Sequence, residues 1–259
     1  MYDLAALDAA LAGTIFSGKL HFQRSTGSTN SDAMVAARNG APHGSMWFAD
    51  EQTAGRGRGD HAWHSAVGQG LYLSLLLRLS AHMPLLPLAA GLAAAAAVRE
   101  ASGLTVDLRW PNDLLIGPRK AGGILVESQS DREQLGFAVV GIGINVHQQG
   151  FAADLATPGT SLDMESGRWI DRQPLLIALL EALERETRVL RDPAAIRTIP
   201  ERVARASTWV KGREVEVHGP QECSGVTDGL DEHGFLRVRT ATGVVQVQTG
   251  GIRAAETRR

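Results

Sequence analysis

The spacing of apolar residues changes along the chain, and the changes predict an α+β fold. Up to about residue 207, helical periodicity alternates with short apolar runs typical of strands. Helices are predicted over residues 29–40, 84–102, 171–190 and 193–206, with an amphipathic helix near the N-terminus. Strands are predicted over residues 45–51, 71–79, 106–110, 114–116, 122–127 and 135–146. A mixed sheet backed by helices accounts for this order.

Three segments support these boundaries in detail. Residues 71–79 are almost all large and apolar, which is typical of a central strand covered on both faces. The T-x-x-D pattern of Thr29 and Asp32 predicts a helix start. Asp192 is the predicted N-cap of the helix over 193–206.

The pattern changes again near residue 207. From there on, short β segments over 212–217, 225–229, 234–239 and 244–248 are separated by glycine turns, which indicates a small β barrel. We therefore expect two domains, residues 1–207 and 208–259. A barrel of this size lies near the lower limit for independent folding, so it should pack on the larger domain.

Composition narrows the possible functions. The 26 basic and 28 acidic residues leave a net charge of −2, so the whole chain carries no electrostatic signature of nucleic-acid binding. The single cysteine, Cys223, excludes an internal disulfide and a multi-cysteine zinc site. The N-terminus lacks the positive start of a signal peptide, and the longest apolar run, 85–98, is shorter than the roughly 20 residues of a spanning helix. We expect a cytoplasmic protein that does not contact the membrane.

The strongest chemical feature is the loop Gly55-Arg56-Gly57-Arg58-Gly59. Its glycines let backbone N–H groups approach an anion, and its arginines offer forked donors for phosphate or carboxylate. It matches neither a Walker loop nor a dinucleotide fingerprint. A flexible solvated loop is the alternative, but its place between two apolar strands favours a ligand loop. Trp63, just behind it, either stacks on a base or fills the core.

Two turns further on also carry candidate chemistry. Arg109-Trp110-Pro111-Asn112-Asp113 ends a strand, and its Asn112 and Asp113 either orient a nucleotide or metal or simply form an Asx turn. Lys120, one of only three lysines, precedes Gly122-Gly123 and a strand. An ammonium there either offsets charge on a phosphate or acyl oxygen or is a solvated turn lysine.

Uncharged polar residues form a third group of candidates. Ser28, Thr29 and Asn30 at a helix start cap the helix or recognise a polar ring such as a ureido group, and Gln52 points from a strand end towards the glycine-rich loop. Gly141-Ile142-Gly143-Ile144-Asn145 has glycines inside a strand, which predicts either space for a ligand or a bulge. No nucleophile–base pair and no histidine spacing typical of a metal site is present, so metal ligands stay unassigned.

Together these segments resemble the biotin protein ligase family, also called biotin–[acetyl-CoA carboxylase] ligase. The resemblance covers residues 20 to 165 and extends to an SH3-like domain at the C-terminus. The matching segments, in the family's order and spacing, are Ser28-Thr29-Asn30, Gln52 with 55–59, Trp63, 110–113, Lys120 with 123–127, 141–145 and Thr160-Ser161-Leu162. Any one of them is weak evidence, whereas seven in register are highly specific.

The resemblance implies a class II tRNA synthetase-like catalytic domain that joins biotin to ATP and transfers it to a lysine of a biotin carboxyl carrier protein. ATP with Mg²⁺ and biotin would be substrates, with no tightly bound prosthetic group. The implied biotin-binding residues are Ser28, Thr29, Asn30, Gln52, Arg56, Gly57, Arg58 and Lys120. The implied nucleotide-binding residues are Trp63, Asn112, Asp113 and Asn145, and the implied catalytic residues are Lys120, Arg56 and Arg58.

Two departures and two alternatives accompany this hypothesis. Repressor members of the family carry an N-terminal helix-turn-helix domain, for which the motif at residue 28 leaves no room, so we expect a monofunctional ligase without specific DNA binding. Gly59-Asp60 is less basic than in many relatives. The alternatives are a lipoate-type protein ligase and a non-catalytic nucleotide- or nucleic-acid-binding protein.

Overall fold

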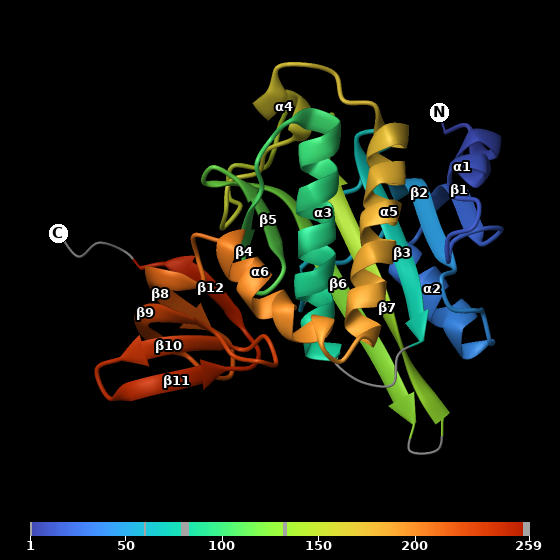
Figure 1. Cartoon of the computed structure of the whole chain (residues 1–259). Helices are drawn as coiled ribbons and strands as arrows, with labels where there is room; N and C mark the ends of the chain where they lie inside the picture. The colour runs from blue at the N-terminus through green and yellow to red at the C-terminus, as the bar shows by residue number, and fades with distance from the viewer. Residues whose placement is uncertain (1, 60, 79–82, 132–133, 256–259) are drawn as a thin grey trace.

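The computed structural model describes residues 2–59, 61–78, 83–131 and 134–255, and these form a seven-stranded mixed sheet joined to a five-stranded one (Figure 1). The larger sheet has the order β1-β2-β3-β7-β6-β5-β4, in which β1 and β2 are parallel and the other neighbours antiparallel. Its strands are β1 (Leu20–Thr26), β2 (Met46–Gln52), β3 (Gly70–Arg78), β4 (Asp107–Arg109), β5 (Asp113–Ile116), β6 (Arg119–Asp131) and β7 (Gln134–Asn145). The α+β prediction is confirmed.

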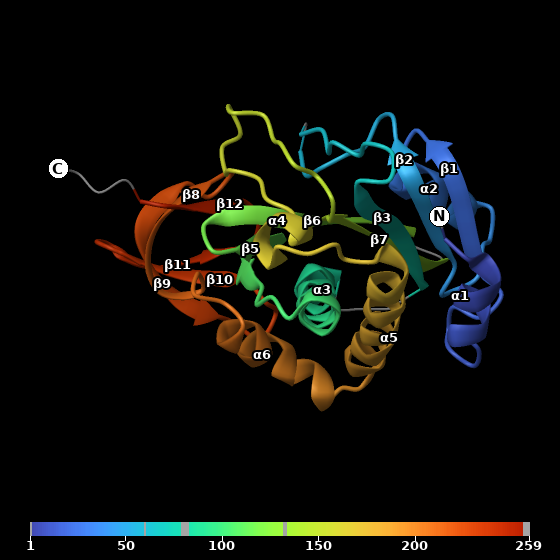
Figure 2. The ribbon, with the colours of Figure 1, turned by 90° about the horizontal axis from the view of Figure 1, so that it is seen from above.

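The helices cover the large sheet unequally. They are α1 (Leu4–Ala10), α2 (Thr29–Arg38), α3 (Leu86–Ser102), α4 (Leu162–Ser166), α5 (Arg172–Arg191) and α6 (Ile199–Arg205), with 3₁₀ turns at Met83–Leu85 and Ala195–Thr198. In Figure 2, α3, α5 and α6 lie on one side of the sheet, and the loops after β2 and β7 rise on the other. None of the helices among the described residues is long and apolar enough to cross a membrane.

Strand alternation assigns each residue of the central strands to one face of the sheet. Leu71, Leu73 and Leu75 of β3 pack in the main core with α3 and α5, whereas Leu76 packs in a smaller cluster with α2. Ser74 shares the face of Leu76, because side chains of a strand alternate. The central strand is therefore buried on both faces, as predicted, but the α2 face carries polar groups at its centre.

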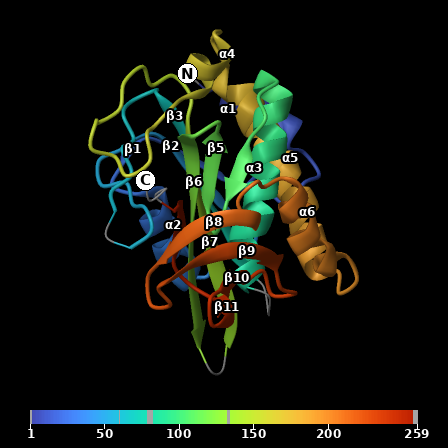
Figure 3. The same ribbon diagram turned by 90° about the vertical axis from the view of Figure 1, so that its left-hand side faces the viewer.

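The C-terminal segment forms a separate antiparallel sheet of order β11-β10-β9-β8-β12, as expected of an SH3-like domain (Figure 3). Its strands are β8 (Lys211–His218), β9 (Cys223–Leu230), β10 (Leu236–Thr240), β11 (Gly243–Val247) and β12 (Gly251–Ala254). Its buried residues belong to the same continuous apolar core as α3 and α6, so the two units pack closely against each other.

Several local predictions were wrong or incomplete. Ser28, not Thr29, is the N-cap of α2, and Asp32 accepts hydrogen bonds from the side chains of Gln23 and Thr26 instead of closing a capping box. The helix over 193–206 is a 3₁₀ turn followed by α6, although the Asp192 carboxylate does cap that turn. The glycines at 141 and 143 do not interrupt β7. Strands β1 and β12 and helix α4 were not predicted.

Candidate active site

A chain of hydrogen bonds between polar side chains lies on the α2 face of the sheet. The Thr29 hydroxyl and backbone N–H donate to Gln52 Oε1 at 3.1 and 2.9 Å, and Gln52 Nε2 donates to Ser65 Oγ at 2.9 Å. Ser74 Oγ lies 2.8 Å from Thr29 Oγ1 and donates to Asn30 Oδ1 at 2.6 Å. Since Thr29, Asn30 and Ser74 are buried, these bonds fix the orientation of both amides.

Glycines of β7 make the space that this arrangement needs. A Cβ at Gly141 would lie 2.2 Å from Asn30 Oδ1, and one at Gly143 would lie 2.5 Å from Trp63 Nε1. Both approaches are far shorter than a real Cβ contact. The strand glycines therefore accommodate an amide and an indole of the site, and the strand pairing stays regular at both of them.

The glycine-rich loop is held at two places by its arginines. Arg56 makes a two-pronged ion pair with Glu127 of β6, with Nη1–Oε1 at 3.0 Å and Nη2–Oε2 at 2.5 Å. Glu127 also accepts a hydrogen bond from Asn30 Nδ2 at 2.8 Å, which connects the loop to the polar chain. Arg58 instead donates to the Gly250 carbonyl and to Thr249 Oγ1 of the C-terminal sheet. The two arginines thus have different partners.

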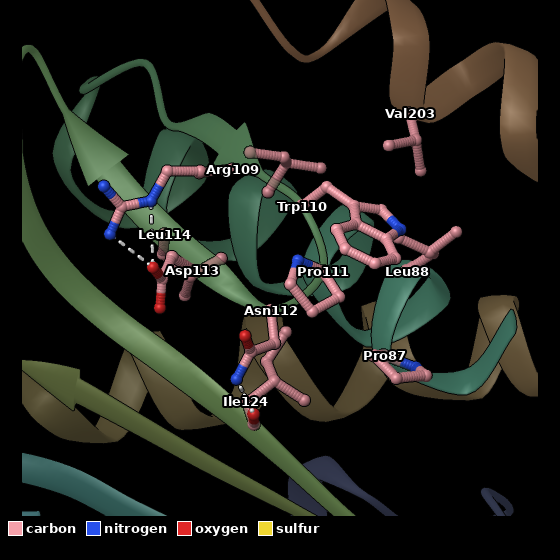
Figure 4. Close-up of a pocket in the computed structure, with 12 residues that line it drawn as sticks. Pro87, Leu88, Arg109, Trp110, Pro111, Asn112, Asp113, Leu114, Ile124 and Val203 are labelled. Atoms are coloured by element: carbon pink, nitrogen blue, oxygen red, sulfur yellow. Dashed lines mark hydrogen bonds and ion pairs between the residues drawn. The ribbon is translucent and has the colours of Figure 1, made fainter. Parts of the chain in front are cut away.

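Lys120 lies in an ion-pair network with the turn before β5. Its Nζ is 2.5 Å from Asp113 Oδ1, and Arg109 donates to Asp113 Oδ2 from Nε at 3.0 Å and from Nη2 at 2.5 Å. The Arg109–Asp113 pair is visible in Figure 4. Burial raises the pKa of Asp113, but the charges and hydrogen bonds of Lys120 and Arg109 more than offset it, so its pKa lies below the usual value.

The indole ring of Trp63 lies between Lys120 and Gly143 of β7. Lys120 Nζ lies 5.6 Å from the centroid of the indole ring, and a Cβ at Gly123 would be 3.5 Å from both Lys120 Nζ and Trp63. Trp63 Nε1 is buried and has no hydrogen-bond partner among the described residues. An indole N–H that is buried and unpaired is unusual, and a ligand acceptor would satisfy it.

The two predicted asparagines use their side chains within the protein. Asn112 Nδ2 donates to the Ile124 carbonyl at 2.7 Å, so its side chain binds the backbone of β6 and does not form a local Asx turn (Figure 4). Asn145 Nδ2 donates to the Thr160 carbonyl at 3.0 Å, close to the point where the Thr160 N–H donates to the Lys120 carbonyl. Asn145 therefore fixes the backbone at Lys120, and Asn112 fixes the same strand at Ile124.

A cavity of about 210 Å³ opens where the loop, the turn at Trp110 and the C-terminal sheet meet. Arg58 and Asn112 contribute to its wall, together with Phe235 and Thr249 of the C-terminal unit. Burial lowers the pKa of Arg58, and the charge of Asp113 partly opposes that effect. The cationic loop and the Lys120 network therefore share one side of the molecule, as the sequence hypothesis requires.

The structure also identifies residues to which the sequence assigned no role. Ser74 and Glu127 each contact two of the candidate side chains, and Arg109 forms an ion pair with Asp113. Ser74 could have been noticed as the one small polar residue in an apolar strand, and Glu127 as a carboxylate on the same strand face as Gly123. No group of three or more histidine, cysteine or acidic side chains among the described residues is arranged to hold a metal ion.

With the geometry in place, comparison with known proteins identifies the class. The model of the biotin/lipoate A/B protein ligase family matches residues 21–145. The bifunctional ligase/repressor BirA of Bacillus subtilis is 34% identical over 233 residues, which cover 87% of this chain and 70% of that protein. The chain belongs to the biotin/lipoate A/B protein ligase family.

Within that family the similarity is to biotin protein ligases. The biotin–[acetyl-CoA-carboxylase] ligase of Mycobacterium tuberculosis is 31% identical, with 88% of this chain and 85% of that protein covered. The solved structure of biotin protein ligase from Aquifex aeolicus in complex with biotin and ATP superposes with a TM-score of 0.80 at 27% identity, covering 92% of this chain and 100% of that one.

Proposed function

We propose that this protein activates biotin with ATP to biotinyl-5′-AMP and transfers biotin to a lysine of a biotin carboxyl carrier protein. The observation that carries the proposal is the juxtaposition on one face of a cluster of uncharged polar side chains and a cationic group. The cluster is formed by Thr29, Asn30 and Gln52, and the cations are Lys120 and the arginines of the loop.

In the first step, a biotin carboxylate oxygen attacks the α-phosphorus of ATP, which enters as its Mg²⁺ complex, and pyrophosphate leaves. Both reactants are anions, so the step requires fixed positive charge in a site with little water. Lys120 supplies an ammonium beside Trp63, and Arg56 and Arg58 supply guanidinium groups on a loop that can reach the substrates. The fixed amides of Asn30 and Gln52 suit the N–H and C=O groups of a ureido ring.

In the second step, the lysine amine of the carrier attacks the acyl carbon of the anhydride, the C–N bond forms and AMP leaves. The enzyme supplies no nucleophile in this scheme. The acceptor is the carrier domain of a carboxylase, because the M. tuberculosis relative is named for acetyl-CoA carboxylase. We place the reaction in the cytoplasm, where carboxylases and ATP are available.

The proposal is tested by ATP–pyrophosphate exchange measured with biotin and, separately, with lipoate. Biotin-dependent exchange supports it, and exchange that depends on lipoate alone would favour the lipoate-type alternative. Salt-sensitive oligonucleotide binding without either exchange would favour a nucleic-acid-binding protein.

The role of Lys120 is tested by Lys120→Ala. Losing the ammonium should lower the kcat of exchange by about 100-fold or more, as for the loss of one electrostatic stabiliser. Lys211→Ala is the matched control, because Lys211 is exposed on the C-terminal sheet, and it should keep wild-type exchange. Full activity of Lys120→Ala would show that Lys120 does not act on the reactants.

A further inference from the structure

Asp113 divides its two carboxylate oxygens between two cations. Oδ1 faces Lys120 Nζ at 2.5 Å, and Oδ2 receives two hydrogen bonds from Arg109. A carboxylate held on one edge by a guanidinium fork cannot rotate without breaking charge-assisted hydrogen bonds. The position of Oδ1, and with it the position of Lys120 Nζ, therefore depends on Arg109.

Arg109 is itself held by the C-terminal half of the chain. Its side chain is only 10% exposed, its Nη2 donates to Thr157 Oγ1 at 2.8 Å, and its Cζ lies 5.2 Å from the ring centroid of Trp209. Trp209 is buried at the start of the C-terminal unit. An arginine over an indole ring is attracted to it, and the attraction is greater where water is excluded.

The strand that carries Arg109 is tied to the same junction. The Leu108 N–H donates to the Ala206 carbonyl at 3.1 Å, and Ser207 Oγ donates back to the Leu108 carbonyl. Asp107 accepts from the Thr208 N–H at 2.8 Å and from its hydroxyl at 2.6 Å. Every residue of β4 thus contacts the segment leading into the C-terminal sheet.

We propose that Arg109 is a positioning residue for Lys120, and that the C-terminal unit holds Arg109 in place through Trp209. Arg109 does not touch the substrates in this proposal. It orients Asp113, and Asp113 holds the ammonium of Lys120 beside Trp63. The contacts between β4 and residues 206–209 keep Arg109 in position. The kinetic part of the inference rests on the proposed ligase function, whereas the geometric part does not.

The test compares Arg109→Met with Arg213→Met. Arg213 Cζ lies 3.7 Å from the centroid of the same Trp209 ring, and Arg213→Met removes the same positive charge. Among the described contacts, Arg213 has none with Asp113. Lys120 and Arg109 are the charged groups that lower the pKa of Asp113, and Arg58 is a third charged group close enough to interact with this carboxylate. Removing Arg109 should therefore raise the pKa of the Asp113 carboxyl, whereas removing Arg213 should leave it unchanged.

The first measurement is the titration of Asp113 by carboxyl-carbon NMR in the ligand-free protein. Arg109→Met should shift the midpoint upwards by about one pH unit or more. The second is the pH profile of biotin-dependent exchange, where the kcat of Arg109→Met should fall roughly 10- to 100-fold and its acid limb should move to higher pH. Arg109→Lys keeps the positive charge, so the acid limb of its pH profile should lie close to that of the wild type.

Three results would overturn the inference: an unmoved Asp113 titration, an activity loss that is the same at all pH values, or an equal effect of Arg213→Met. If Arg109→Met does not fold, Arg109→Gln removes the same charge with a polar side chain and decides by the same titration. An absence of exchange in the wild-type enzyme would refute the ligase function instead, and the NMR titration would still test the position of Asp113.

Discussion

At the scale of single residues, the site depends on where side chains are missing. Two glycines in the middle of a buried strand weaken it, so their presence indicates that something needs the space. The sequence left open whether that was a ligand or a bulge. In the structure, Gly141 faces the amide of Asn30 and Gly143 faces the indole of Trp63, so each glycine serves a different half of the site.

This division predicts separable effects. Gly143→Ala should displace Trp63, because the added Cβ would lie 2.5 Å from Nε1, and should weaken binding of a non-hydrolysable ATP analogue by roughly tenfold or more. Gly141→Ala should displace Asn30 and weaken biotin binding in the same way. Calorimetry with each ligand measures both.

Gly150→Ala is the control, because nothing lies within 4 Å of its added Cβ. Equal losses of biotin and nucleotide affinity in both strand variants would show that the glycines only support the fold and do not shape two subsites.

The same scale shows what the sequence could not determine. Thr29 fits a capping pattern, yet it is the first residue within α2, and its hydroxyl donates to Gln52 and lies beside the Ser74 hydroxyl. Helix-start residues often cap their own helix, and only tertiary contacts decide otherwise. Which candidates gather on one face could be predicted from resemblance, but their hydrogen-bond partners could not.

At the scale of secondary-structure elements, long and strongly patterned segments were predictable and short ones were not. The central strand and the helices α3 and α5 have continuous apolar patterns. In contrast, β1 is a half-exposed edge strand, and β12 and α4 have only four and five residues. Such elements gain their stability from neighbours and not from local pattern, so they leave a weak signal in the sequence.

The ion pair between Arg56 and Glu127 is one of the two contacts by which arginines hold the glycine-rich loop. Arg56 and Glu127 are partly exposed, with side-chain exposures of 43% and 27%, so the pair should contribute about 1 kcal/mol. In Glu127→Gln the loop should open about fivefold more often, and trypsin should cleave after Arg56 or Arg58 correspondingly faster. Limited proteolysis with peptide mapping measures this rate.

Glu222→Gln is the matched control, because Glu222 is exposed on the C-terminal unit. Saturating biotin and ATP analogue should slow cleavage in the wild type, since the substrates would bring new anions to the loop arginines. Unchanged cleavage in Glu127→Gln would contradict a tethering role for Glu127.

At the scale of the whole molecule, the two units share one apolar core and meet at the site. The proposed boundary near residue 207 falls between α6 and β8, yet Trp209 and Val210 are buried in the same core as α3. The turn at Gly234 packs so closely on α3 that a Cβ there would lie 2.6 Å from Leu88 Cδ1. The C-terminal unit is therefore positioned to act on the catalytic turn, an arrangement that strand spacing alone could not reveal.

A hydrogen bond of Trp110 joins the two units, and its contribution to the free energy of unfolding can be measured. Its Nε1 donates to the Gly234 carbonyl at 3.1 Å in a buried contact between the units. Trp110→Phe removes the donor and leaves that carbonyl unpaired, which should lower the free energy of unfolding by about 1–3 kcal/mol in urea titrations. Because the core is continuous, both variant and wild type should unfold in one transition.

Trp169→Phe is the control, because its side chain is 71% exposed, and it should change the free energy of unfolding by no more than about 0.5 kcal/mol. Two resolved transitions in the wild type would mean that the units fold separately, and the C-terminal sheet could then not fix the position of Arg109.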